Sequence, residues 1–193
     1  MADVAMTMTP VRRAPLDGLA GDPRARWAVP MARFSLRLPE AAIGAASASL
    51  GLDLAGPINN VAEREGCAIL RLGPDEWLVL ANDADSAAIA AALDRGMPDR
   101  RFSLVDIGHR QTGIVLDGAD AADMLSAGCP LDLDLAAFPV GMATRTIFAK
   151  AEIVLWRTAP TRFHIEVWGS FAPYVWALLK EIGREYPVME NTP

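Results

Sequence analysis

Two stretches decide how this chain folds: "CAILRLGPDEWLVLANDADSAAIAAALDRG" at residues 67–96 and "AEIVLWRTAPTRFHIEVWGSFAPYVWALLKEIG" at residues 151–183. Each contains an apolar strand-like run, a turn with a proline, a second apolar run and an amphipathic stretch of helical period. The two patterns coincide at a separation of 86 positions. The matched pairs are Pro74 with Pro160, Trp77 with Phe163, Val79 with Ile165 and Leu93 with Leu179. The chain therefore contains an internal repeat.

A strand and a helix are also predicted before each hairpin. "FSLRL" leads into "PEAAIGAASASLG" at residues 34–51, and "TGIVL" leads into "DGADAADMLSAG" at residues 112–128. Gly51 and Gly128 end these helices, where a left-handed residue is common. We therefore predict an α+β fold, with two related strand-helix-hairpin-helix subdomains and antiparallel sheets.

The repeat and the flanking composition predict the domain boundaries. We expect an N-terminal arm at residues 1–30, where prolines are frequent and periodicity is weak, and a C-terminal tail at residues 185–193. The first α+β subdomain is predicted at 31–100 and the second at 101–184.

The second hairpin predicts one apolar strand face and one mixed face. If Ala159 lies opposite Arg162, then Val154 and Trp156 share the apolar face with Phe163. The mixed face then carries four interface candidates, which are Arg157, His164, Glu166 and Trp168. Two interpretations remain open: this face is covered by the other sheet or by the arms, or it is a docking surface with Trp and Arg anchors.

Composition excludes several classes of function. A formal net charge of −6 gives no general attraction for nucleic acid. No apolar run predicts a membrane span, and the N-terminus shows no secretory signal. Two cysteines and two histidines cannot form a zinc site at normal spacing, so no metal is expected. The absence of a disulfide framework suits a reducing cytoplasm.

The polar cluster most worth testing starts in "SLVDIGHRQTGIVLDG" at residues 103–118. Its members are Asp106, His109, Arg110 and Gln111, with Arg145 and Glu152 further along the chain. His109 is a general base by residue type or a hydrogen-bonded structural histidine. The two arginines suit a carboxylate ligand or ion pairs at a subunit boundary. We predict no catalytic residue on this chain.

Motifs for cofactor binding and nucleophilic catalysis are missing from the sequence. It contains no G-x-G-x-x-G after a strand and no G-x-S-x-G elbow. The chain therefore gives no dinucleotide-binding fingerprint.

The stretch "DIGHRQTGIVLDGADAADML" at residues 106–125 resembles the folate-binding T-protein (aminomethyltransferase) of the glycine cleavage system. The resemblance implies similarity to the folate-binding domains of that protein. In that family, two acidic residues open the second hairpin after a pair of glycines. Here Ala151 and Glu152 stand at the acidic positions, with Phe148 and Ala149 nearby. The polar cluster is therefore interpreted as a vestigial folate site or a subunit contact.

Longer runs resemble the gamma subunit of bacterial heterotetrameric sarcosine oxidase. They are "RLGPDEWLVL" at 71–80, "GHRQTGIVLDGADAADMLSAGCPLDLDLAAFPVGMATRT" at 108–146 and "KAEIVLWRTAPTRFHIEVWGSFAPYVWALL" at 150–179. This resemblance implies a cytoplasmic complex that demethylates sarcosine oxidatively to glycine, with formaldehyde or methylenetetrahydrofolate and hydrogen peroxide as further products. It implies FAD, FMN and NAD on alpha and beta partners, zinc on a delta partner and tetrahydrofolate as one-carbon acceptor.

We therefore predict a non-catalytic accessory subunit, acting in assembly and stability, with no cofactor of its own. One alternative is a free-standing folate-binding or one-carbon transfer protein, which requires His109, Arg110, Arg145 and Glu152 to meet in one pocket. Another is the matching subunit of a related N-methyl amino acid oxidase or dehydrogenase.

Overall fold

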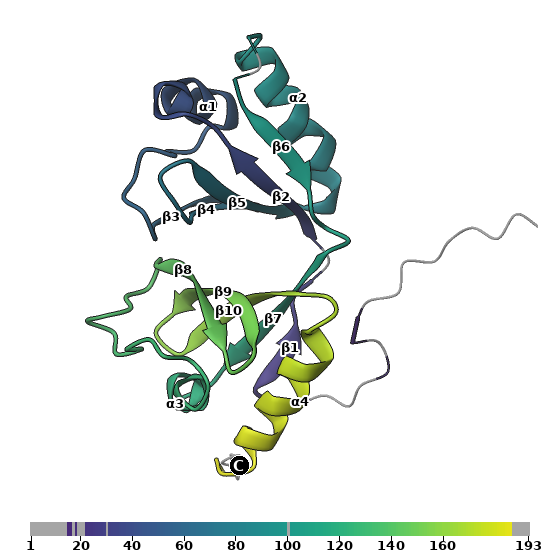
Figure 1. Cartoon of the computed structure of the whole chain (residues 1–193), viewed down its shortest axis with the longest axis vertical. Coiled ribbons are helices and arrows are strands. Elements are labelled where there is room, and N and C mark those ends of the chain that lie inside the picture. The colour runs from purple at the N-terminus through teal and green to yellow at the C-terminus, as the bar shows by residue number, and fades with distance from the viewer. Residues whose placement is uncertain (1–14, 17, 19–21, 30, 100, 187–193) are drawn as a thin grey trace, which may run out of the picture.

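The computed structural model describes residues 15, 16, 18, 22–29, 31–99 and 101–186. Two α+β units are stacked so that their sheets face each other and their helices lie on the two outer sides (Figure 1). The layers thus run helix, sheet, sheet, helix. The predicted fold class, with two antiparallel sheets in related units, is confirmed.

The first unit has a five-stranded sheet in the order β3-β4-β5-β2-β6. Its strands are β2 (Met31–Arg37), β3 (Val61–Arg64), β4 (Cys67–Arg71), β5 (Glu76–Asn82) and β6 (Ser103–Asp106). Its helices are η1 (Glu40–Ala42), α1 (Ile43–Leu50), η2 (Asp83–Asp85) and α2 (Ser86–Gly96). The buried residues of α1 and α2 pack on the outer face of this sheet, against side chains such as Trp77 and Val79.

The second unit has the corresponding order β1-β7-β10-β9-β8. Its strands are β1 (Ala25–Trp27), β7 (Gln111–Asp117), β8 (Ala143–Phe148), β9 (Ala151–Ala159) and β10 (Arg162–Trp168). Its helices are α3 (Ala121–Ser126) and α4 (Ala172–Gly183), which cover the outer face of the sheet.

The repeat is visible in the bounds of the elements. The strands β5 and β10 begin 86 positions apart and end 86 positions apart, as the matched apolar positions predicted. Trp77 and Phe163 are both buried on the helix side of their sheets, and so are Leu93 and Leu179 on the facing helices. The two halves therefore bury the same positions in the same way.

The two units exchange edge strands, which corrects the predicted boundaries. β1 lies within the predicted arm 1–30 but pairs with β7 of the second sheet, Trp27 lying opposite Ile114. β6 lies within the predicted second subdomain 101–184 but pairs with β2 of the first sheet. Each of these strands precedes one unit in the chain and completes the sheet of the other. Sequence similarity between the halves gives no sign of this exchange, because β1 and β6 lie outside the repeated stretches.

The predicted face assignment was wrong for one strand of the second hairpin, β9. Ala159 lies opposite Arg162 as predicted, but a register shift follows, and Phe163 lies opposite Arg157. A shift of one residue turns every later side chain of a strand to the other face. Arg157 therefore shares the helix side with Phe163. Val154 and Trp156 point toward the other sheet together with His164.

The first hairpin contains the same irregularity. Arg71 lies opposite Trp77, and the backbone N–H groups of Leu72 and Gly73 both donate to the carbonyl of Glu76. Ile69 of β4 therefore lies on the helix side with Trp77, and Leu70 lies on the inner face with Leu78.

The inner faces of the two sheets pack on each other and form a third core. Leu70, Leu78 and Leu80 from the first sheet contact Val154 and Trp156 from the second. The sheets are also joined at one edge, because Asn60 and Met142 form an antiparallel bridge. The part of the predicted mixed face that carries His164 and Glu166 is therefore covered by the other sheet, which was one of the two interpretations left open, whereas Arg157 lies on the helix side.

Only one of the two predicted helix-ending glycines is left-handed. Gly51 has φ of 66°, as predicted. Gly128 is absent from the positive-φ residues of the described chain. A Cβ at this position would lie 2.9 Å from the ring of Phe148, so close packing explains the glycine.

Candidate functional site

A short turn connects the two sheets and carries the predicted polar cluster. Residues 107–110 follow β6 of the first sheet and precede β7 of the second. The Asp106 carboxylate accepts a hydrogen bond of 2.7 Å from the N–H of Gly108, and the Arg110 N–H donates to the carbonyl of Ile107. Asp106 and His109 are exposed. Asp106 therefore shapes the turn.

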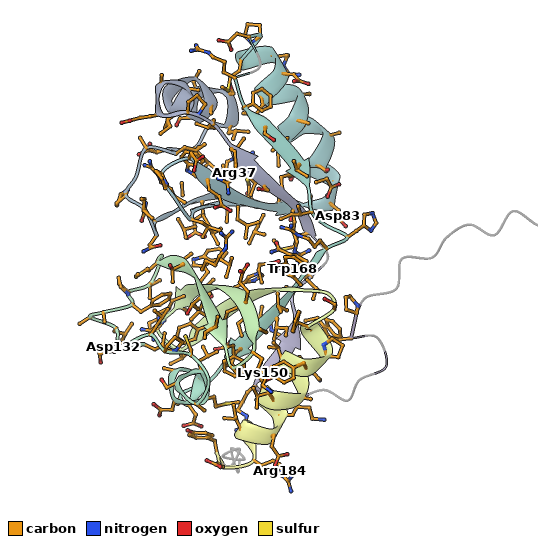
Figure 2. The ribbon with its side chains drawn as sticks, in the orientation of Figure 1. Arg37, Asp83, Asp132, Lys150, Trp168 and Arg184 are labelled. Carbon is orange, nitrogen blue, oxygen red and sulfur yellow. The ribbon has the colours of Figure 1, made fainter. Side chains whose placement is uncertain are left out.

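Arg110 and Gln111 lie against the end of β10. The Arg110 guanidinium carbon is 4.9 Å from the ring centroid of Trp168, a cation–π contact, and the Arg110 carbonyl accepts from the N–H of Gly169. Figure 2 labels Trp168 at the level where the two sheets meet. Gln111 lies opposite Trp168 in the sheet, and its side-chain oxygen is buried without a hydrogen-bond partner among the described residues.

Arg145 and Glu152 belong to an ionic network that joins the sheets. Arg145 on β8 donates two hydrogen bonds, of 2.6 and 3.3 Å, to the carboxylate of Glu76 on β5. The hydrogen bond to Glu76 raises the pKa of Arg145, and the negative charge of Glu152 at 3.7 Å acts in the same direction. Glu76 also accepts from Arg37 of the first sheet. These side chains are already paired within the chain.

A small hollow brings three of the predicted residues together. It is lined by Arg110, Gln111 and Arg145, together with residues of both sheets, whereas Asp106, His109 and Glu152 are not part of its lining. Its volume of about 20 Å³ has room for about one water molecule. Such a water could donate a hydrogen bond to the unpaired side-chain oxygen of Gln111. Sites for small organic molecules usually measure roughly 300–1,000 Å³. The hollow therefore does not fit a folate.

A buried triad of charged and polar side chains spans the two sheets beside this hollow. Arg33 on β2 donates from Nε to Glu166 Oε2 at 2.6 Å and from Nη2 to Glu166 Oε1 at 3.0 Å. His164 lies 2.7 Å from the same Oε1 through its Nε2. Burial would raise the pKa of Glu166, but the hydrogen bonds and charges of His164 and Arg33 outweigh it and lower that pKa. The three groups hold an ion pair inside the protein.

A glycine makes room for the triad. A Cβ placed on Gly113 of β7 would lie 2.6 Å from Ala28, 2.9 Å from Glu166 Oε1 and 3.0 Å from His164. The position therefore requires the absence of a side chain. The strand β7 therefore packs its backbone directly against the triad.

Three of the four interface candidates are buried inside the chain. Arg157, His164 and Glu166 are 1%, 7% and 1% exposed, and only Trp168 of the four reaches the surface, at 40%. Burial lowers the pKa of the Arg157 guanidinium, while the charge of Asp134 opposes this shift.

Arg33 and Glu76 were not predicted from the sequence. A signal for Arg33 was present, because it alternates with Ala32 and Phe34 and so belongs to the same inner face as its partner. Nothing in the sequence paired it with Glu166, which lies 133 positions away.

In the part of the chain that the structure describes, no group of three or more His, Cys, Asp or Glu side chains could hold a metal ion. Across the same residues, no helix is both long enough and apolar enough to cross a membrane.

The geometry defines a class of protein: two related α+β units, face to face, with a buried ionic triad between their sheets. The same fold is found in the glycine cleavage system aminomethyltransferase T from Bartonella henselae, with a TM-score of 0.62 at 17% identity. That match covers 80% of this chain and 44% of the other.

The particular family follows from two closer comparisons. The family model described as sarcosine oxidase, gamma subunit family, matches residues 38–185, so the chain belongs to that family. A chain in the heterotetrameric sarcosine oxidase from Corynebacterium sp. U-96, in complex with pyrrole 2-carboxylate, matches with a TM-score of 0.83 and 27% identity. This match covers 94% of the present chain and 99% of the other.

A curated relative agrees over a shorter stretch. The sarcosine oxidase subunit gamma of Corynebacterium sp. (strain P-1) is 34% identical over 110 residues, which is 57% of this chain. The matched stretch spans 53% of the length of that relative.

Proposed function

We propose that this chain is the non-catalytic gamma subunit of a heterotetrameric sarcosine oxidase, acting in the assembly and stability of the complex. The complex would demethylate sarcosine oxidatively to glycine, giving hydrogen peroxide and either formaldehyde or methylenetetrahydrofolate. The observation that carries the proposal is the match to a chain of a solved heterotetrameric sarcosine oxidase over nearly the whole length of both chains.

The partners in this proposal are alpha, beta and delta subunits in the cytoplasm. FAD, FMN and NAD would bind to the large subunits, zinc to the delta subunit, and tetrahydrofolate would accept the one-carbon unit there. The present chain would carry none of these groups. Its candidate site supports this division, because the side chains that resemble a folate site are engaged in pairs such as Arg145 with Glu76.

Within the complex, the ionic contacts between the sheets would keep the chain rigid. Arg33 with Glu166 and Arg145 with Glu76 each join one sheet to the other. The side chains left for partners are those at the surface, including Trp168 and the exposed apolar residues of the same unit.

Absorbance and activity measurements on the isolated chain test whether it is non-catalytic. The purified chain should show no flavin absorbance, and adding sarcosine with oxygen should give no hydrogen peroxide. The assembled complex should do both. Peroxide production by the isolated chain, at a rate comparable to that of the complex, would contradict a non-catalytic role.

A folate-binding protein is the second candidate, favoured by the fold shared with aminomethyltransferase T. The five tryptophans allow a fluorescence titration of the isolated chain with tetrahydrofolate. We expect no saturable quenching, because the hollow beside Gln111 has room for about one water molecule. Saturable quenching at micromolar folate, lost in Arg110→Ala, would favour the second candidate instead.

A further inference from the structure

Arg157 and Arg71 occupy equivalent positions in the two halves, 86 positions apart. Arg71 lies opposite Trp77, with its guanidinium carbon 5.2 Å from the ring centroid. Arg157 lies opposite Phe163, with its guanidinium carbon 4.5 Å from the ring centroid. The chain thus builds the same arginine–aromatic pair twice.

The two arginines differ in their hydrogen bonds. Arg71 donates to the main-chain carbonyl oxygens of Ala55, Gly56, Gly73 and Pro74. Arg157 donates from Nη2 to the carbonyl of Leu133 at 2.6 Å, while its Nε and Nη1 are buried with no partner among the described residues. Buried guanidinium donors without acceptors are unfavourable, so the second half lacks carbonyl groups that the first half supplies itself.

The space beside the two arginines also differs: it is closed beside Arg71 and open beside Arg157. Beside Arg71, the loop around Leu54 and Gly56 closes the site and leaves no volume for a water molecule. Arg157 instead lines an open pocket of about 440 Å³ between α3, the loop that contains Leu133 and the β9–β10 turn. We call it the Arg157 pocket; Asp123, Asp132, Asp134, Leu135 and Pro160 also line it. Figure 2 labels Asp132 on the loop at the left of the second unit.

The lining defines the chemistry of the ligand. The positive charge of Arg157 favours oxygen atoms nearby, whereas the carboxylates of Asp123, Asp132 and Asp134 favour a positive charge. Leu135 at the pocket is 49% exposed and offers an apolar contact. A free anion is disfavoured by the three carboxylates, and a metal ion is disfavoured by the guanidinium. A basic peptide segment offers all three elements, since it has carbonyl oxygens, cationic side chains and apolar carbon.

We propose that the Arg157 pocket binds a basic peptide segment of a partner chain. Main-chain carbonyl oxygens of this segment lie in the pocket near the positive charge of Arg157, whose own Nε and Nη1 stay buried. Lysine or arginine side chains of the segment pair with the three aspartates. The inference rests on the proposed function for the existence of a partner chain, and it assigns one surface of this chain to that contact.

Replacing the three aspartates by asparagine tests the role of their negative charge and keeps side chains of similar size in the pocket. Asp132 and Asp134 each accept a backbone N–H within their own loop, and asparagine retains the oxygen that does so. The triple variant Asp123→Asn, Asp132→Asn, Asp134→Asn should weaken binding to the co-expressed partner chains about tenfold at low salt, with a smaller effect at high salt. The matched control is Asp53→Asn, Asp83→Asn, Asp99→Asn, which changes the same net charge on exposed residues of the first unit.

A photo-cross-linker locates the contact directly. Leu135 is replaced by p-benzoylphenylalanine in the assembled complex, and Val105, which is 52% exposed on the first unit, serves as the control position. The expected product joins position 135 to a partner peptide containing lysine or arginine, in higher yield than position 105 joins to any such peptide.

The outcomes separate this inference from the proposed function. If the wild-type chain assembles, but the triple variant binds equally well and position 135 forms no cross-link, the pocket holds only water and the inference is overturned. A cross-link to a partner peptide without basic residues also overturns it. If the wild-type chain does not assemble with sarcosine oxidase subunits at all, both the proposed function and this inference are overturned.

Discussion

Arg33 of the first sheet and Glu166 of the second form a bidentate ion pair inside the protein, with N–O distances of 2.6 and 3.0 Å. Their side chains are 5% and 0% exposed. The pair joins strands from the two repeated halves, and His164 completes it. The two sheets therefore share a polar contact in the middle of an apolar core.

Breaking this pair on one side should destabilise the chain strongly. Arg33→Met leaves the Glu166 carboxylate buried without its cation, and we expect a loss of about 3–5 kcal/mol in the free energy of unfolding. Urea denaturation measures it. Arg33→Met with Glu166→Leu should recover much of the loss, because both charges are gone. Arg184→Ala, which removes an exposed pair with Glu181, should cost roughly 0.5 kcal/mol or less. Equal losses for Arg33→Met and Arg184→Ala would refute the buried pair.

Stability should also depend on pH through Glu166. Its pKa in the folded chain lies below the ordinary value of 4.5, so its contribution is present above that pH and is lost as pH falls through the folded pKa. Urea midpoints of the wild type should therefore drop steeply below about pH 4.5. Glu166→Gln should show a flatter profile over this range, from a lower starting stability. Parallel profiles for the two proteins would show that Glu166 does not titrate as expected.

Gly113 should not tolerate a side chain. Gly113→Ala places a Cβ against Ala28 and Glu166, so we expect a loss of about 1–3 kcal/mol in the free energy of unfolding. Gly44→Ala is the matched control, since Gly44 lies in the first turn of α1 and no atom lies within 4 Å of a Cβ built there. It should stabilise the helix by roughly 0.5–1 kcal/mol. Thermal denaturation should show a lower melting temperature for Gly113→Ala and a higher one for Gly44→Ala.

Ala149 is strained at the β8–β9 turn. Its φ of 51° lies in the left-handed region, which is unfavourable for alanine. Ala149→Gly should therefore stabilise the chain by roughly 0.5–1 kcal/mol, seen as a higher melting temperature. Asn59→Gly is the comparison, because Asn59 also has positive φ, at 72°, but asparagine tolerates it better. A larger gain at Asn59 than at Ala149 would argue against strain at the turn.

Local sequence patterns predicted the elements of the fold well. Strand alternation and helical period located both hairpins and their helices, and the separation of 86 positions held for whole elements such as β5 and β10. These features depend on neighbouring residues, which is why a single sequence shows them.

The features that were missed depend on backbone irregularity or on distant pairing. The register shift after Arg162 reversed the faces of β9, and hence the assignment of Arg157. The exchange of β1 and β6 between the sheets depends on pairing partners far away in the chain, such as Trp27 with Ile114. Residue type made His164 and Glu166 interface candidates, whereas both are buried within the chain, and nothing in the sequence paired them with Arg33.

The candidate site shows the same limit. Arg110, Gln111 and Arg145 line one hollow, whereas His109 and Glu152, which the folate-binding alternative also required there, do not. The hydrogen-bond partner of Arg145 could not be read from the sequence, because Glu76 lies in the other half of the chain. Glu76 already accepts hydrogen bonds from the guanidinium that a ligand would need.

The most direct test of the account is the native mass of the complex formed on co-expression of this chain with the alpha, beta and delta subunits of a sarcosine oxidase from the same organism. The account predicts one heterotetramer with one copy of this chain, bound flavin and sarcosine-dependent peroxide, and loss of the intact tetramer when this chain is omitted. A complete, active and equally stable oxidase without this chain, or a chain that stays monomeric beside its partners, would contradict the account.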